Sequence, residues 1–151
     1  MRALFLWLQS REFGDLLSGL EYPSNFRLQQ IKDKSGYNLV RNDIENFSRL
    51  LSSFESYSKT IYRGIFKNDD VYKQIQSGKT SIVTKRYYSC TKNINIGKSF
   101  GQKILLIINC KRNFNISKHS REEEIVLDKS VRLNVVSMRT ENEHEIIELS
   151  L

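Results

Sequence analysis

The chain has little proline, glycine or cysteine, and each scarcity argues against a class of protein. Its 151 residues include one Pro and seven Gly, too few for a collagen-like, linker-rich or disordered chain. The two cysteines, Cys90 and Cys110, form no Cys-x-x-Cys pair and no metal-ligand spacing, which is weak evidence for a reducing compartment. The length predicts one globular domain with room for a hydrophobic core.

Long apolar runs are also absent. Residues 3–8 resemble the start of a signal peptide, but the run stops at Gln9, before a full hydrophobic region and without a small-residue cleavage site. No segment reaches the length that spans a bilayer. We therefore expect a cytoplasmic protein with no membrane partner.

Acidic residues are scarce in the middle of the chain. Residues 56–118 hold thirteen basic side chains and two acidic ones, a net charge of +11, whereas residues 1–55 net zero and residues 119–151 net −4, giving +7 in total. Such a basic segment favours an anionic ligand or partner, for example a dinucleotide pyrophosphate, RNA or DNA. The alternative is a solvated basic face.

Hydrophobic periodicity predicts two structural parts. Over residues 1–57 apolar residues recur at helical spacing, in one stripe around Phe13 and in a second, beginning near Asn42, around Phe47 and Leu51. Beyond this region the pattern predicts a helical turn at 71–77 and strands at 60–66, 82–91, 104–108, 125–127, 131–136 and 145–149. The expected fold class is α+β, a helical N-terminal region followed by two packed, mainly antiparallel sheets.

The first predicted strand contains Arg63 followed by Gly64. An arginine in an apolar strand is costly to bury unless an anion meets it, and a guanidinium group suits a phosphate. Gly64 would let a ligand approach the backbone closely. The alternative is an arginine at a strand end that pairs with a surface carboxylate.

Hydroxyl side chains mark the end of the strand predicted at 82–91. Alternation places Ser89 and Thr91 on one face and Tyr88 and Cys90 on the other. Two hydroxyls on one face would position a ligand or orient a neighbouring carboxylate. An ordinary strand edge is the alternative.

Three adjacent carboxylates, Glu122, Glu123 and Glu124, lead directly into an apolar strand. Like charges on one strand face repel each other, so the arrangement is poor material for stability alone. Alternation places Glu122 and Glu124 together, where one carboxylate can stabilise a developing sugar cation and the other can handle a nucleophile. A solvated acidic turn is the alternative.

In this order, Tyr62-Arg63-Gly64, Ser89-Cys90-Thr91 and Glu122-Glu123-Glu124 resemble the motifs of the R-S-E mono-ADP-ribosyltransferases, which include bacterial toxin and phage enzymes. The resemblance covers residues 58–150 and implies a single ADP-ribosyltransferase domain over residues 1–151. Residues 1–57 would form its helical lobe, and residues 58–151 its β-rich NAD+-binding core. Cys90 departs from the family's central Thr, with its side chain facing away.

The resemblance also implies a role for each matched residue in binding NAD+, the co-substrate. Arg63 would hold the phosphates and ribose beside Gly64, and Ser89 would orient the catalytic glutamate. Thr91 and Phe100 would line the NAD+ site. Glu124 would bind the nicotinamide-ribose 2′-hydroxyl and stabilise the oxocarbenium-like transition state as nicotinamide leaves.

Acceptor residues follow from the same resemblance. Glu122 would steer or deprotonate the acceptor, and a mobile loop at residues 113–121 would face it, with Phe114 and His119 toward the acceptor. No metal is expected, because His119 and His144 lack partners at metal-ligand spacing.

The implied function is transfer of ADP-ribose from NAD+ to a macromolecular acceptor with release of nicotinamide. The Glu-x-Glu pair favours a protein arginine, and the basic middle segment keeps a base of RNA or DNA as the alternative acceptor. An alternative of another class is a non-catalytic RNA- or protein-binding module on the same fold. Small relatives in toxin–antitoxin and phage-defence systems imply a toxin with an antitoxin or other inhibitory partner.

Overall fold

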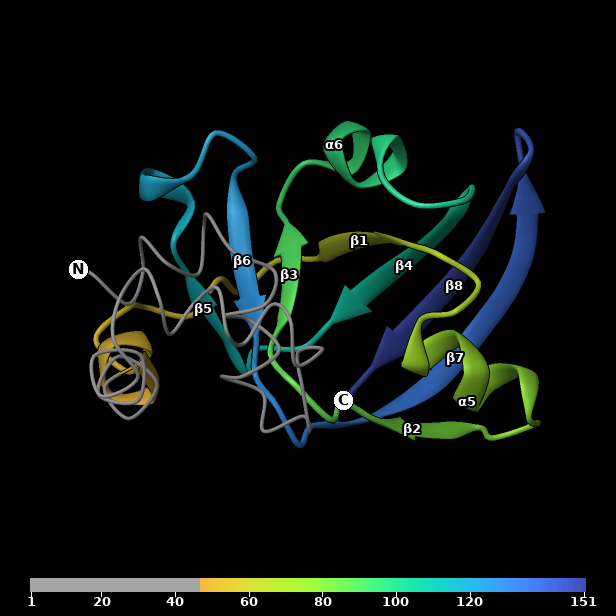
Figure 1. Cartoon of the computed structure of the whole chain (residues 1–151), viewed down its shortest axis with the longest axis horizontal. Helices are drawn as coiled ribbons and strands as arrows, with labels where there is room; N and C mark the ends of the chain where they lie inside the picture. The colour runs from red at the N-terminus through yellow and green to blue at the C-terminus, as the bar shows by residue number, and fades with distance from the viewer. Residues whose placement is uncertain (1–46) are drawn as a thin grey trace, which may run out of the picture. The chain divides into compact units, whose positions relative to one another are not determined.

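The computed structural model describes residues 47–151 (Figure 1). The chain divides into two compact units, Met1–Glu55 and Ser56–Leu151. In the first unit residues 47–51 are helical, with Phe47 and Leu51 fully buried. The stripe predicted around Phe13 and the helix start predicted near Asn42 lie outside the described residues. Within residues 47–151 no helix has the length and apolar character that a membrane span requires.

The second unit has the predicted α+β character, with one mixed sheet in the described part of the chain. Its eight strands follow the order β2-β7-β8-β4-β1-β3-β6-β5. Strands β4 and β8 are parallel, and the other neighbouring pairs are antiparallel. The strands are β1 (Ile61–Ile65), β2 (Ser81–Val83), β3 (Tyr88–Thr91), β4 (Ile104–Asn109), β5 (Asn113–Asn115), β6 (Glu124–Leu127), β7 (Arg132–Glu141) and β8 (His144–Ser150).

The prediction of two packed sheets is corrected by the pairing of β1 with β3, which joins all eight described strands in one sheet. Strands β1 and β3 pair at one register position, Tyr62↔Thr91, whereas β1 pairs with β4 at five positions and β4 with β8 at six. In Figure 1 strands β3 and β6 stand nearly upright while β4 and β8 run diagonally. The sheet is therefore continuous but changes direction sharply where β1 meets β3.

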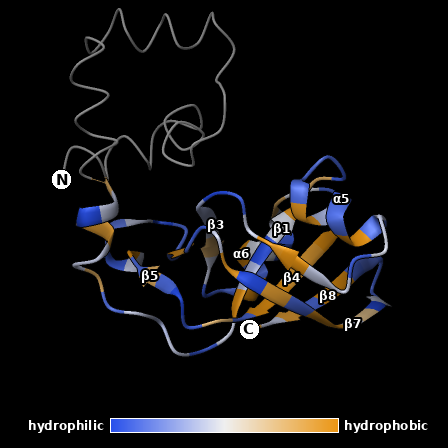
Figure 2. Cartoon of the chain, turned by 90° about the horizontal axis from the view of Figure 1, so that it is seen from below, coloured by the Kyte–Doolittle hydropathy of each residue, from blue (hydrophilic) through white to orange (hydrophobic). Residues whose placement is uncertain are grey.

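The apolar run in β4 forms the centre of the unit. Leu105 and Leu106 are both buried although they point to opposite faces, as a continuous apolar strand predicts. The Leu106 face joins a core that β1, β8 and the helix α5 (Asp70–Gln76) complete. On the other face Gly97 of the helix α6 (Ile94–Ser99) approaches Leu105. Figure 2 shows the hydrophobic residues concentrated along β4 and β8.

The two helices of the second unit begin at capping side chains. The Asp69 carboxylate accepts a hydrogen bond of 2.9 Å from the Val71 N–H at the start of α5, an N-cap that agrees with the predicted helical turn. Asn93 caps α6 in the same way, with 2.9 Å to the Asn95 N–H. The helix α6 was not expected, because its isoleucines, Ile94 and Ile96, stand two residues apart, a spacing typical of strands.

The extended run predicted at residues 82–91 is two strands. β2 lies at one edge of the sheet and β3 lies in the interior, between β1 and β6. Between them Thr84 leaves the sheet, where its hydroxyl donates to the Asp128 carbonyl (3.0 Å) and accepts from the Val131 N–H (2.8 Å). Periodicity alone could not predict that the chain passes from the edge of the sheet to its interior between β2 and β3.

The mobile loop predicted at residues 113–121 has regular structure in its first part. β5 pairs with β6, and a 3-10 turn, η1 (Ser117–His119), follows. The buried Asn113 anchors the start of β5, with Nδ2 donating to the Cys110 carbonyl at 2.8 Å. The sequence Asn-Phe-Asn is too short for its alternation to predict a strand.

Candidate active site

Ser89 and Glu124 are in direct contact. β3 and β6 pair with Ser89 opposite Val126 and Thr91 opposite Glu124, so these four residues share one face of the sheet. The Ser89 hydroxyl donates a hydrogen bond to Oε1 of Glu124. Glu124 is only 5% exposed, and a buried carboxylate needs donors of this kind to stay in place. The contact fixes the carboxylate on the face that carries the two hydroxyl residues.

Arg63 lies in the middle of β1, and its side chain reaches β3. Its Nη1 donates to the Ser89 carbonyl oxygen at 2.6 Å, and its Nη2 lies 3.5 Å from Oδ2 of Asp69. Its guanidinium carbon lies 4.7 Å from the centre of the Tyr88 ring, within cation–π range. Arg63 therefore connects β1 to β3 beyond their single register pair.

The Arg63 side chain is partly exposed, but its unpaired polar atom is buried. The side chain is 21% exposed, and its buried Nε has no hydrogen-bond partner in the described part of the chain. An unpaired buried N–H is costly. The carboxylate that Arg63 meets, Asp69, is buried, so the alternative of an arginine pairing with a surface carboxylate does not describe this residue.

Two neighbours of Arg63, Asp69 and Tyr88, were not predicted as part of the site. Asp69 is one of two acidic residues in the basic middle segment, and no motif in the sequence marks it as an arginine partner. Tyr88 packs in the core, and burial, followed by the Asp69 charge, raises its pKa to about 12. Its hydroxyl has no hydrogen-bond partner among residues 47–151.

The three glutamates occupy three different environments. β6 begins at Glu124, and Glu123 has a φ of +51°, so the chain turns before the strand starts. Glu122 is exposed, Glu124 is buried, and the Glu123 carboxylate accepts a hydrogen bond of 2.9 Å from Nδ2 of Asn93. Glu122 precedes the strand, so the strand alternation from which we predicted its place beside Glu124 does not extend to it.

Gly64, Thr91 and Phe100, all predicted to bind NAD+, make contacts within the chain. A Cβ on Gly64 would collide with the carbonyl oxygens of Gly97 and Phe100, so the close approach expected of a ligand is made here by the end of α6. The Thr91 hydroxyl donates to the Glu122 carbonyl at 2.7 Å and accepts from the Asn93 N–H at 3.1 Å. Phe100 caps α6 and is 46% exposed.

The residues predicted to face the acceptor lie on and beyond β5. Phe114 pairs with Val126, which also pairs with Ser89, so Phe114 and Ser89 share a face. His119 ends η1 and is exposed, as is Glu122. All three lie on the segment that leads into Glu124.

Neither a metal-binding group nor the Cys90 thiol offers an alternative catalytic centre in the described part of the chain. Within residues 47–151 no group of three or more His, Cys, Asp or Glu side chains could hold a metal ion. Burial raises the pKa of Cys90 to about 12, so its thiol is not activated as a nucleophile.

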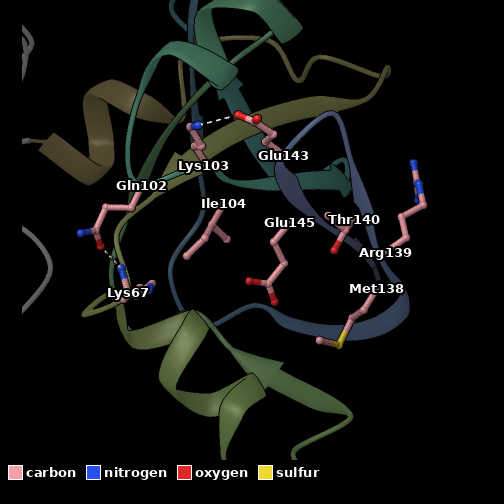
Figure 3. Close-up of a pocket in the computed structure, with 9 residues that line it drawn as sticks. All are labelled: Lys67, Gln102, Lys103, Ile104, Met138, Arg139, Thr140, Glu143 and Glu145. Carbon is pink, nitrogen blue, oxygen red and sulfur yellow. Dashed lines mark hydrogen bonds and ion pairs between the residues drawn. The ribbon is translucent and has the colours of Figure 1, made fainter.

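A groove of about 470 Å³ lies beside the β7–β8 hairpin (Figure 3). Glu145 points into it and accepts a hydrogen bond of 3.0 Å from the Tyr72 hydroxyl. Its lining includes none of the predicted site residues; it consists of Lys67, Gln102, Lys103, Ile104, Met138, Arg139, Thr140, Glu143 and Glu145. The groove and the Arg63–Ser89–Glu124 cluster are thus separate features.

Comparison with known proteins identifies the fold. No protein-family model and no curated protein matches the chain. Exoenzyme S of Pseudomonas aeruginosa, solved with human 14-3-3 protein beta and carba-NAD, is 17% identical, with a TM-score of 0.66 over 98% of this chain and 70% of that one. Vis of Vibrio splendidus, an ADP-ribosyltransferase solved with agmatine, is 13% identical, with a TM-score of 0.60 over 93% and 74%.

The ATR domain of Salmonella SpvB aligns over nearly its whole length. It is 15% identical, with a TM-score of 0.65 over 99% of this chain and 96% of that one. At these identities the likeness concerns the fold rather than the activity. The chain has the ADP-ribosyltransferase fold.

Proposed function

We propose that the chain is an NAD+-dependent mono-ADP-ribosyltransferase of the R-S-E family, with Glu124 as its catalytic carboxylate. The observation that carries the proposal is the hydrogen bond from the Ser89 hydroxyl to buried Glu124, with Arg63 bonded to the backbone carbonyl of the same serine. The three residues lie on the neighbouring strands β1, β3 and β6, in the order of the family motifs. Exoenzyme S, of similar fold, was solved with carba-NAD, which supports NAD+ as the co-substrate.

Arg63 fits the pyrophosphate of NAD+. Its side chain is 21% exposed, so a ligand can reach part of it. Contacts to the Ser89 carbonyl and to Asp69 hold the group in one orientation. A guanidinium group held in this way binds an anion with less loss of side-chain entropy than a free one. Arg63 thus binds the phosphates while Asp69 keeps it oriented.

Glu124 stabilises the positive charge that develops on the ribose. The bond between the nicotinamide nitrogen and ribose C1 breaks, and its electron pair leaves with nicotinamide. A carboxylate that is buried interacts more strongly with this charge than one in water. Ser89 supplies the hydrogen bond that keeps the carboxylate in position before the reaction, so little reorganisation is needed at the transition state.

Glu122 acts on the acceptor, for which we favour an arginine side chain of a protein. Glu122 is exposed, so a macromolecule can reach it. A guanidinium nitrogen attacks ribose C1 and passes its proton to Glu122, which acts as a general base. The structure of Vis with agmatine, itself a guanidinium compound, supports this acceptor. Vis, a toxin of similar fold, supports a role as a toxin.

A base of RNA or DNA is the second candidate acceptor. The observation in its favour is the net charge of +11 over residues 56–118, which exceeds the need of one pyrophosphate. A nucleic-acid acceptor would bind with steep salt dependence, and a protein acceptor would not.

The test of the proposed function is label transfer from NAD+. The purified full chain is incubated with labelled NAD+ and a cell lysate, in parallel with Glu124→Gln and the matched control Glu123→Gln. We expect label in protease-sensitive material with the wild type and the control, and none with Glu124→Gln. Label in nuclease-sensitive material would move the acceptor to nucleic acid. Folded wild-type protein that releases no nicotinamide and transfers no label would overturn the proposal.

A further inference from the structure

We propose that Asn93, outside the three motifs, is a positioning residue that holds Glu123 and thereby directs ADP-ribose to the acceptor rather than to water. The inference rests on the proposed function and deepens it. It starts from the backbone at Glu123, where the chain leaves the exposed Glu122 and enters the buried strand β6.

Glu123 adopts a left-handed conformation that needs support from its surroundings. Its φ is +51°, which is unfavourable for a residue with a Cβ. Three hydrogen bonds hold it: its N–H donates to the Ser120 carbonyl (3.3 Å), its carbonyl accepts from the Lys92 N–H (3.2 Å), and its Oε2 accepts from Nδ2 of Asn93 (2.9 Å). Two of the three come from the segment that follows β3.

The Asn93 amide serves two elements at once. Its Oδ1 accepts from the backbone N–H groups of Asn95 (2.9 Å) and Ile96 (3.4 Å) and so caps α6. Its Nδ2 donates to the Glu123 carboxylate. Only a side-chain amide combines an acceptor for the cap with a donor for the carboxylate, because an aspartate at this position has no donor and a serine is shorter.

The backbone of Asn93 strengthens the same connection. Its N–H donates to the Thr91 hydroxyl (3.1 Å), and that hydroxyl donates to the Glu122 carbonyl (2.7 Å). Both Glu122 and Glu123 are thus tied to residues 91–93. These contacts hold the backbone from which the exposed Glu122 carboxylate extends.

Glu124 depends on a different set of contacts. It lies in the β3–β6 ladder opposite Thr91, and the Ser89 hydroxyl holds its carboxylate. Loss of the Asn93–Glu123 hydrogen bond would shift Glu122 while Glu124 stays in place. Cleavage of NAD+, which needs Glu124, should continue, whereas transfer, which needs Glu122, should fail.

The experiment compares two rates in the full chain. One rate is nicotinamide release without an acceptor, and the other is transfer of label from NAD+ to agmatine and to lysate. Asn93→Asp keeps the helix cap but places a second carboxylate against Glu123. We expect it to lower transfer about tenfold relative to nicotinamide release, the effect of losing one charge-assisted hydrogen bond.

Two further variants separate positioning from general structure. Glu123→Gln keeps an acceptor for Asn93 but loses the charge, so nicotinamide release should be unchanged and transfer should fall less than in Asn93→Asp. The double variant Asn93→Asp with Glu123→Gln reverses the hydrogen bond, since the new amide at position 123 donates to the new carboxylate at position 93. It should recover most of the lost transfer, and thermal denaturation should show all three variants folded.

Each other outcome overturns the inference. If Asn93→Asp lowers both rates equally, or if the double variant recovers nothing, Asn93 is only structural. Unchanged transfer in Asn93→Asp, from an active wild type, removes the inference and leaves the proposed function intact. Wild-type protein that releases nicotinamide but labels no acceptor also removes the inference, and wild-type protein without nicotinamide release removes both.

Discussion

The two parts of the sheet that meet at β1 are stabilised in different ways. On the β4 side the strands share long ladders, five register pairs from β1 to β4 and six from β4 to β8, around the buried Leu106. On the other side β1 pairs with β3 at one position only, and the Arg63 side chain donates to the Ser89 carbonyl there. The difference teaches that the polar residues of the candidate site also join the two parts of the sheet.

The largest expected change in stability lies on the apolar side. Leu106→Ala removes a buried side chain at the centre of β4 and should lower the free energy of unfolding by about 3 kcal/mol. The proposed transferase activity per folded molecule should persist, because Leu106 belongs to the core cluster rather than to the polar site. Urea unfolding measures the change, and Val136→Ala, at a 62% exposed position, is the control with little expected effect.

Arg63→Ala should lower stability less but abolish activity. It leaves the buried Asp69 without its cation and the Ser89 carbonyl without its donor, at a cost of about 2 kcal/mol because the pair is partly exposed. Arg63→Lys keeps the charge but not the two-pronged geometry. We expect it to unfold at a higher urea concentration than Arg63→Ala and to remain poor in NAD+ binding. An active Arg63→Ala would contradict this account of Arg63, which connects β1 to β3 and binds NAD+.

Ser89→Ala should have a smaller effect on stability than on the reaction. Loss of one donor to the Glu124 carboxylate costs about 1 kcal/mol. The Ser89 carbonyl that Arg63 contacts is retained, so the connection from β1 to β3 through Arg63 remains. Nicotinamide release should fall about tenfold. Equal stability and equal activity in Ser89→Ala would show that the Ser89–Glu124 contact has no function.

The smallest expected change at neutral pH is that of Tyr88→Phe. The ring over Arg63 remains, and the hydroxyl that is lost has no hydrogen-bond partner in the described part of the chain, so stability should stay equal or rise slightly.

The effect of this substitution should grow at alkaline pH. Burial raises the pKa of both Tyr88 and Cys90 to about 12, above about 10 and about 8.5 in an unfolded chain. Because the folded state binds these protons more tightly, the stability they contribute is complete below about pH 8.5 and is lost as the pH rises towards 12. Tyr88→Phe should lose less stability than the wild type between pH 10 and 12 in urea unfolding, and an unchanged profile would contradict the burial effect.

Sequence patterns predicted the local elements better than their assembly. The apolar run predicted β4, periodicity predicted a helical turn where α5 lies, and the motifs around Arg63, Ser89 and Glu124 resembled the family whose fold the comparisons bear out. The turn at Glu123 could not be predicted, because its left-handed backbone depends on Asn93, 30 residues away. The same limit applies to the bend of the sheet, which depends on how far β1 and β3 pair.

Nicotinamide release from NAD+ by single glutamine variants of the three glutamates tests the central claim most directly. The buried, Ser89-bound Glu124 should be essential, so Glu124→Gln should release nicotinamide at least about a thousandfold more slowly. Glu122→Gln should keep release but lose transfer to agmatine, and Glu123→Gln should keep release and most of the transfer. Release by Glu124→Gln at the wild-type rate would contradict the assignment of the catalytic carboxylate.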